Sequence, residues 1–373
     1  MFRIHNSKNI RECCLLRKLS LLRKKAFEVK DLDGLLILNE ANMFYVSGFN
    51  GAAALLITRD SGDFLYVYGV NYEQAKAESK DFQIELIERG ERPLSKIAQK
   101  VKSLGIKNLA FDMLGLEGYR EIVKVLKDGV KLRMCNKLLW ELRKVKDEEE
   151  LMLMRKAAEL TMEGMKAAYA NVKPGVKEYE VAAEIEYAMR RHGSWGTAFD
   201  TIVASGPRSA YPHGGCTERE IRDGDLVVVD IGASYKYYRS DMTRTLVAGA
   251  PTKKQQELYE LVKRAQENAL LHVKPGVEAK LVDMMARKII VEAGYGDFFV
   301  HGLGHGIGIE VHEPPTLSPQ SKDILCQGNV VTIEPGIYIV GFGGVRIEDT
   351  ILVNLGSYEK FTDGFYSLEP QKF

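Results

Sequence analysis

The chain has 373 residues, of which 45% are hydrophobic and 9% aromatic, so it is long enough for two domains and apolar enough to fold around a core. Its 52 Lys and Arg residues almost balance 51 Asp and Glu residues, and the net charge of +1 argues against nucleic acid as a partner. No segment approaches the roughly 18 apolar residues of a membrane-spanning helix, and Arg17 and Lys18 interrupt the short apolar run near the N-terminus, which excludes a signal-peptide core.

Five cysteines form no Cys-x-x-Cys motif, and their number is odd. This usage is typical of reduced thiols, so we expect a cytoplasmic protein that has neither a disulfide framework nor a thiolate zinc site.

The first part of the chain alternates short apolar runs with longer amphipathic stretches. Residues 35–38, 52–57, 64–68 and 109–111 are predicted strands, and residues 97–104 and 119–126 are predicted helices. The alternation predicts a small α/β domain that contains no cluster of chemically useful side chains.

A charged stretch at 141–150 precedes a helical pattern at 151–169. Asp147 with Glu150 three residues later resembles a capping box, which predicts a helix start there. We therefore expect an N-terminal domain over 1–143 and a second domain over 144–373. The alternative is one long helix that crosses this boundary.

The second part contains an internal repeat. Val-Lys-Pro-Gly-Val at 172–176 recurs at 273–277, 101 residues later, and the helical patterns that follow end at Gly193 and Gly294. Strand-like residues 224–232 match 328–336 in the same order. We infer a duplication with pseudo-two-fold symmetry, which would bring matched residues together around one axis.

Four carboxylates accompany strand-like segments in two matched pairs: Asp230 with Asp241, and Glu334 with Glu348. Burying an unpaired carboxylate is costly, so one alone would suggest a helix cap or an ion pair with an arginine. Four together predict a cationic partner. Hard oxygen ligands with an imidazole suit two divalent ions such as Mn²⁺, Co²⁺, Zn²⁺ or Fe²⁺.

The imidazole candidates are His301, His305 and His312, which lie within twelve residues and are interleaved with glycines at every second position from 302 to 308. Such glycines let the backbone approach a ligand closely. Strand alternation would place residues 301, 303 and 305 on one face. His213, in the segment 199–214, is by itself a loop histidine with a weaker claim.

Residues 147–365 resemble the pita-bread metallopeptidase family (M24), which includes methionine aminopeptidases, aminopeptidase P and prolidase. The resemblance rests on the eleven-residue step from Asp230 to Asp241, on Gly-His-Gly at 304–306, on Thr-Ile-Glu-Pro-Gly at 332–336 and on Arg-Ile-Glu-Asp at 346–349. The preceding domain is similar to the creatinase-like N-terminal domain of the proline-specific branch. The implied fold class is α+β, with a smaller α/β domain before a pita-bread catalytic domain.

The resemblance implies five metal ligands, listed as Asp230, Asp241, His305, Glu334 and Glu348. Asp241 and Glu348 would bridge two ions per subunit, for which Mn²⁺ or Co²⁺ is the first expectation and Zn²⁺ or Fe²⁺ the alternative. Glu334 would also act as general base.

Substrate contacts are implied for five residues beside the metal ligands. His213 and His312 would stabilise the tetrahedral intermediate, His301 would border the proline side, and Arg346 would contact the substrate or a metal ligand, with Tyr338 a weaker candidate.

We therefore expect a metal-dependent hydrolase of Xaa-Pro bonds, with an Xaa-Pro dipeptidase (prolidase) as first choice and a homodimer as the family's usual assembly. The alternatives are an Xaa-Pro aminopeptidase that acts on longer peptides, a metal-free creatinase-like hydrolase, and a non-catalytic binding module.

Overall fold

A computed structural model describes residues 15–29 and 31–370 of the chain. The chain divides between Arg143 and Lys144 into two structural units, described one at a time below. Within the described residues, no helix combines the length and the apolar character needed to cross a bilayer.

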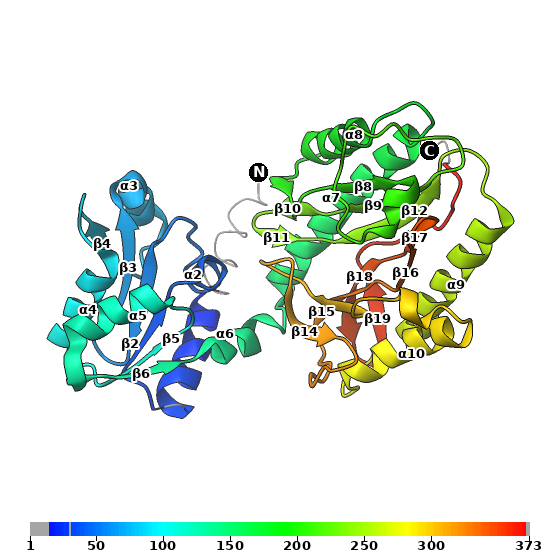
Figure 1. Ribbon diagram of the computed structural model, residues 1–373. Coiled ribbons are helices and arrows are strands. Elements are labelled where there is room, and N and C mark those ends of the chain that lie inside the picture. Colours follow the sequence, from blue (N-terminus) through cyan, green and yellow to red (C-terminus); the bar gives the residue numbers. More distant parts are fainter. Residues whose placement is uncertain (1–14, 30, 371–373) are drawn as a thin grey trace, which may run out of the picture. The chain divides into compact units, whose positions relative to one another are not determined.

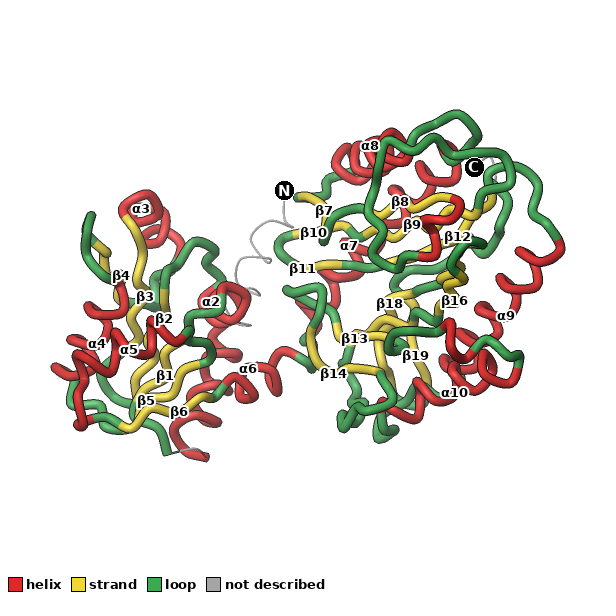
Figure 2. Tube along the Cα trace, viewed as in Figure 1, coloured by secondary structure: helices red, strands yellow, loops and turns green. Residues whose placement is uncertain are grey.

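The first unit is built on a mixed six-stranded sheet in the order β4-β3-β2-β1-β5-β6 (Figures 1 and 2). The strands are β1 (Gly34–Ile37), β2 (Ala54–Thr58), β3 (Asp63–Tyr68), β4 (Gln83–Ile87), β5 (Asn108–Phe111) and β6 (Lys131–Met134). The central strands are buried on both faces, as their continuous apolar runs predict. The strands predicted at 35–38, 52–57, 64–68 and 109–111 are all present, with ends shifted by one or two residues.

Helices accompany this sheet, and their apolar faces supply its core. They are α2 (Glu40–Ser47), α3 (Gly69–Glu78), α4 (Pro93–Ser103), α5 (Leu116–Leu126) and α6 (Asn136–Arg143), with a π-helical turn at Lys24–Val29 and a 3₁₀ turn at Lys127–Gly129. Ile97 and Val101 on α4 and Ile122 on α5 are almost fully buried. Both predicted helices are therefore confirmed, each starting a few residues earlier than expected.

The chain does not cross the boundary as one helix, because α6 ends at Arg143 and α7 (Glu148–Asn171) begins five residues later. Asp147 caps α7 by accepting a hydrogen bond from the backbone N–H of Glu150, whose side chain accepts one from the N–H of Asp147. This is the capping box that the sequence predicts.

The second unit contains the same arrangement twice (Figure 1). In the first half, α7 and α8 (Glu178–Arg191) pack beside a sheet in the order β12-β9-β8. In the second half, α9 (Lys253–Leu270) and α10 (Ala279–Glu292) pack beside a sheet in the order β14-β13-β15-β18-β19. A separate core lies under each helix pair.

The remaining bounds of this unit follow. The strands are β7 (Gly196–Thr197), β8 (Ile202–Ser205), β9 (Leu226–Ile231), β10 (Ala233–Tyr235), β11 (Tyr238–Arg239), β12 (Met242–Val247), β13 (Gly304–Gly306), β14 (Glu313–Leu317), β15 (Val330–Ile333), β16 (Gly336–Ile339), β17 (Gly343–Arg346), β18 (Asp349–Asn354) and β19 (Ser357–Lys360), and the 3₁₀ turns are Gly206–Ala210 and Gly296–Phe298.

Backbone hydrogen bonds repeat between the halves at the Lys-Pro-Gly turns. The N–H of Gly175 donates to the carbonyl of Ile221 at 2.9 Å, and the N–H of Gly276 donates to that of Leu325 at 2.8 Å. The antiparallel strand pairs β9–β12 and β15–β18 then occupy matching places. The α+β class and the internal duplication that the sequence predicts are confirmed.

Candidate metal centre and substrate pocket

The four predicted carboxylates lie on or next to the two matched strand pairs, β9–β12 and β15–β18. Asp230 lies on β9 and Asp241 directly before β12, whereas Glu334 follows β15 and Glu348 directly precedes β18. Asp230 aligns with Thr243 across the first strand pair, and Ile333, next to Glu334, aligns with Asp349 across the second. The duplication thus delivers two carboxylates from each half to one place.

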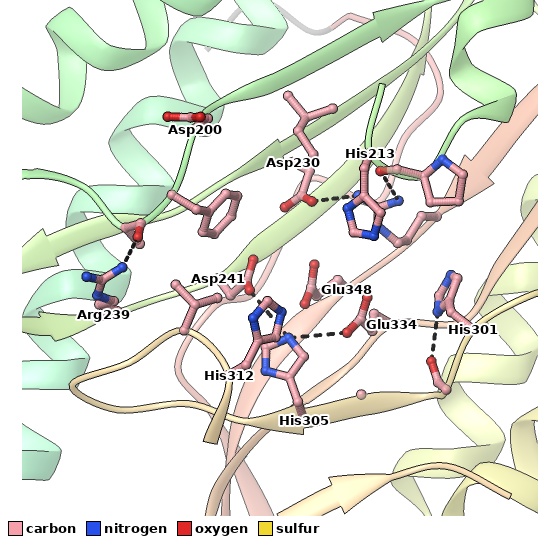
Figure 3. A pocket seen from close by; sticks show the side chains of 18 of the residues that line it. Asp200, His213, Asp230, Arg239, Asp241, His301, His305, His312, Glu334 and Glu348 are labelled. Carbon is pink, nitrogen blue, oxygen red and sulfur yellow. Dashed lines mark hydrogen bonds and ion pairs between the residues drawn. The ribbon is translucent and has the colours of Figure 1, made fainter. Parts of the chain in front are cut away.

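These carboxylates face one another with His305, which is the central residue of β13 (Figure 3). One ligand atom from each of Asp241, His305 and Glu348 lies within 4.8 Å of the other two, so the three could hold a metal ion. His305 Nε2 is 3.4 Å from Glu334 Oε1 and 3.8 Å from Asp241 Oδ2. The five sequence-predicted ligands therefore converge.

Burial and mutual repulsion make this group of carboxylates unstable as free anions. Burial, reinforced by neighbouring carboxylates, raises the pKa values of Asp241 and Glu348 well above their usual range. Burial also raises the pKa of Glu334 to about 8, and the charge of Asp230 adds to the rise while Arg346 opposes it. A bound cation would relieve both effects.

Two oxygen atoms support the same conclusion. Oδ1 of Asp230 and Oδ1 of Asp241 are buried and accept no hydrogen bond from the part of the chain that is described. Buried carboxylate oxygens normally have partners, so the lack of one at these two oxygens fits ligands for a cation. The donor set, carboxylates with one neutral imidazole, suits divalent metal ions.

Neighbouring side chains fix the carboxylates in place. Thr243 Oγ1 donates to Glu348 Oε2 at 2.6 Å, and Thr332 Oγ1 donates to Glu334 Oε1 at 3.2 Å. Neither threonine is among the sequence-predicted site residues. The sequence could have indicated Thr332, because it lies two residues before Glu334 in the Thr-Ile-Glu-Pro-Gly motif. The role of Thr243 depends on a contact with Glu348, 105 residues away.

Arg346 contacts the carboxylate group at Asp230 and is almost fully buried. Its Nη2 donates to Asp230 Oδ2 at 2.6 Å, and its Nη1 donates to the Tyr338 hydroxyl at 2.8 Å. A second, longer bond of 3.4 Å reaches the carbonyl of Pro212, next to His213. The guanidinium therefore contacts a predicted metal ligand and also the loop that carries a predicted substrate histidine.

A cavity of about 870 Å³ opens onto these groups. Nine of the ten predicted site residues line it, including His213, His301 and His312. Burial lowers the pKa of His312, and burial together with the charge of Arg346 lowers that of His301 to about 4. The His305 and His312 rings meet edge to face, with centroids 4.4 Å apart.

Tyr338 is the predicted site residue that does not line the cavity. Its hydroxyl is hydrogen-bonded to His301 Nε2 at 2.9 Å as well as to Arg346, and burial raises its pKa to about 12. Its place behind the cavity wall suits a residue that orients His301.

The predicted strand face through residues 301, 303 and 305 is wrong. Strand β13 covers only Gly304–Gly306, so the alternation does not extend back to residue 301. Leu303 is fully buried in the core, whereas His301 and His305 line the cavity. The two histidines reach the same space from an irregular segment and a short strand.

Two glycines of this segment are required by close backbone packing, and one of them, Gly304, also lines the cavity. A Cβ atom on Gly304 would lie 2.1 Å from the carbonyl oxygen of Thr332, and one on Gly306 would lie 2.4 Å from that of Pro314. Neighbouring backbone therefore excludes any side chain at both positions.

Further lining residues lack a sequence signal. Arg239 and Asp200 contribute charge, and Phe199 and Ile202 contribute apolar surface. None of them belongs to a motif, and a hydrogen bond from Arg239 Nη1 to the carbonyl of Ala198 joins the segment after α8 to β11.

Two family models together match nearly the whole chain. The model of metallopeptidase family M24 matches residues 152–354, and that of the creatinase/prolidase N-terminal domain matches residues 20–145.

Individual relatives agree with the family models. The chain is 43% identical to a protein of Pyrococcus horikoshii named Xaa-Pro dipeptidase, over 91% of this chain and 96% of that one. A solved structure described as an Xaa-Pro dipeptidase from Bacillus anthracis superposes with a TM-score of 0.89 at 36% identity, covering 95% of this chain and 99% of the other. Another solved structure, described as an X-Pro aminopeptidase from Thermotoga maritima, superposes with a TM-score of 0.82 at 37% identity, covering 90% of this chain and 97% of the other.

Proposed function

The chain belongs to metallopeptidase family M24, and on that premise we propose that it is a dinuclear metal-dependent Xaa-Pro dipeptidase. The observation that carries the proposal is the convergence of four carboxylates and one histidine from both halves on a single cavity. The names of the relatives from Pyrococcus horikoshii and Bacillus anthracis support the choice of substrate.

The family implies divalent metal ions, and Asp241, His305 and Glu348 form a group that could hold one. We further propose two ions per subunit, Mn²⁺ or Co²⁺ before Zn²⁺ or Fe²⁺. Asp241 and Glu348, one from each half, would bridge the ions, while Asp230 would complete one set of ligands and His305 with Glu334 the other. When bound, the ions supply Lewis acidity and acidify the attacking water.

The side chains then divide the proton transfers and charge stabilisation among them. Glu334 would accept a proton from the attacking water as the peptide carbonyl is attacked. His312, whose pKa desolvation lowers, and His213 would donate hydrogen bonds to the oxygen on which negative charge develops, and Glu334 would pass the proton that it accepted to the leaving nitrogen. Arg346 would hold Asp230 in position throughout.

The preference for proline follows from the bond that is cut. An Xaa-Pro bond is a tertiary amide, so its nitrogen carries no hydrogen for the enzyme to recognise. His301, oriented by Tyr338, would border the proline ring on its side of the cavity.

A second candidate is an Xaa-Pro aminopeptidase, which the likeness to the Thermotoga maritima structure favours. The deciding experiment compares hydrolysis of Met-Pro and Arg-Pro-Pro after chelation and reconstitution with Mn²⁺, Co²⁺ or Zn²⁺. We expect metal-dependent cleavage of the dipeptide. A marked preference for the tripeptide would establish the aminopeptidase instead.

The same assay tests the remaining alternatives. Full hydrolysis after chelation would indicate a metal-free hydrolase, and a protein that neither retains metal nor cleaves either peptide would be a binding module. The homodimer and the cytoplasmic location stay predictions, the first of which light scattering on the purified protein would test.

A further inference from the structure

The cavity has two chemically different ends on either side of the carboxylate cluster. Figure 3 shows His301 at one side and Arg239 with Asp200 at the other. Under the proposed function, His301 borders the proline, so the residue before proline would lie toward Arg239.

Arg239 gives its end of the cavity a fixed positive charge. Its backbone N–H donates to the carbonyl of Gly308 at 2.9 Å, and its Nη1 donates to the carbonyl of Ala198. These two bonds hold the residue at both its backbone and its guanidinium, which reduces the entropy lost when an anion binds.

The guanidinium has no carboxylate at ion-pairing distance among the described residues. Glu310 and Glu313 are close enough to interact with its charge, but neither forms an ion pair with it, and Glu313 is paired with Lys146 at 3.4 Å. A partly buried guanidinium whose donors are only partly used is well suited to bind a carboxylate, in which two N–H groups can meet two oxygens.

Two other features strengthen this assignment. Phe199 and Ile202 line the same cavity, and apolar surface beside a charge lowers the local dielectric and strengthens an ion pair. Asp200 carries the opposite charge but is exposed, so solvent screens it more than Arg239.

We propose that Arg239 is a specificity residue that favours substrates with aspartate or glutamate immediately before proline, by pairing with the side-chain carboxylate. This inference rests on the proposed function. It assigns a preference for the substrate residue before proline, which the proposed metal ligands do not determine.

The test is steady-state kinetics of the Mn²⁺-loaded enzyme on Glu-Pro, its neutral isostere Gln-Pro, and Leu-Pro. For the unmodified enzyme we expect kcat/KM to be about tenfold higher for Glu-Pro than for Gln-Pro, as expected of one charge-assisted pair. Arg239→Gln should bring the two substrates to near equality while cleavage of Leu-Pro changes little. Arg239→Lys should keep part of the preference.

Arg191→Gln is the matched control, because it removes the same charge from an exposed position outside the cavity lining. It should leave the ratio of Glu-Pro to Gln-Pro unchanged. A rise in salt should lower the ratio for the unmodified enzyme and leave it unaltered for Arg239→Gln.

Three results would overturn the inference. One is a ratio near unity in the unmodified enzyme, and another is a high ratio that survives Arg239→Gln. The third is an equal loss of kcat/KM for Glu-Pro and Leu-Pro in Arg239→Gln that does not occur with Leu-Pro amide. That result would show that Arg239 binds the C-terminal carboxylate of the substrate. In all three cases, cleavage of Leu-Pro by the unmodified enzyme would still support the proposed function. Failure to cleave any Xaa-Pro peptide would overturn both proposals.

Discussion

Arg346 Nη2 donates a hydrogen bond to Asp230 Oδ2 at 2.6 Å, joining β17 in the second half of the duplicated unit to β9 in the first. Both side chains are largely removed from solvent, with exposed fractions of 4% and 14%. One charge of the carboxylate cluster is thus compensated by the protein itself, which leaves the charges of Asp241, Glu334 and Glu348 for the proposed cations to compensate.

The first prediction concerns this contact. Arg346→Met should weaken Mn²⁺ binding and kcat/KM by about 10- to 100-fold, because Asp230 loses the partner that orients it. It should also reduce the free energy of unfolding by about 3–5 kcal/mol, since a largely buried carboxylate is left without its cation. Metal titration of activity and urea unfolding would measure the two effects. Undiminished Mn²⁺ affinity would show that Arg346 does not position Asp230.

The second prediction concerns the two proposed bridging ligands. Asp241→Ala and Glu348→Ala should each abolish both metal loading and hydrolysis, because each removes a ligand from both proposed ions. Elemental analysis of the dialysed protein, together with Met-Pro hydrolysis, gives the readout. The control is Glu260→Ala, which removes an exposed carboxylate on α9. Either variant retaining metal and full activity would refute the ligand assignment.

The third prediction concerns pH and the metal-free protein. Burial raises the pKa of Glu334 to about 8, so the stability contributed by its protonated form is complete below the unfolded value of 4.5 and is lost as pH rises through about 8. Asp241 and Glu348 shift in the same direction. The lowered pKa of His301 acts oppositely, but only below its ordinary value of 6.5.

Between about pH 7 and about pH 8.5, the chelated protein should therefore lose thermal stability, which differential scanning calorimetry would measure. Saturating Mn²⁺ should remove most of this slope, and Glu334→Gln should reduce it without metal, since Asp241 and Glu348 still contribute. A chelated protein whose Tm is constant over this interval would contradict the raised pKa values of the buried carboxyl groups.

The fourth prediction concerns Tyr338. Tyr338→Phe removes the hydroxyl that is bonded to His301 and Arg346 and should raise KM for Met-Pro severalfold, because His301 loses its orientation. The cost in stability should be about 1–3 kcal/mol, the usual effect of leaving a buried group without a partner. Kinetics with Met-Pro would separate KM from kcat. An unchanged KM with lowered stability would limit Tyr338 to a structural role.

Much of the fold could be predicted from the sequence because its signals are local. The capping box at Asp147 and Glu150 depends on four adjacent residues, and the central strands are visible as apolar runs. The duplication was also visible in the sequence as the repeated Lys-Pro-Gly segment, and in the structure both copies make the same backbone hydrogen bonds. The prediction for residues 301–305 failed because alternation holds only along a continuous strand, and β13 starts at Gly304.

The sequence by itself determined the family, the fold class and the candidate metal ligands, because short motifs carry them and each motif depends on neighbours along the chain. Only the tertiary structure decided which atoms meet. It joined Arg346 to Asp230 across 116 residues, placed Tyr338 behind His301, and left Arg239 facing a cavity without a carboxylate partner among the described residues. Such contacts depend on how separate strands and loops pack against one another, and spacing along one strand contains no record of that packing.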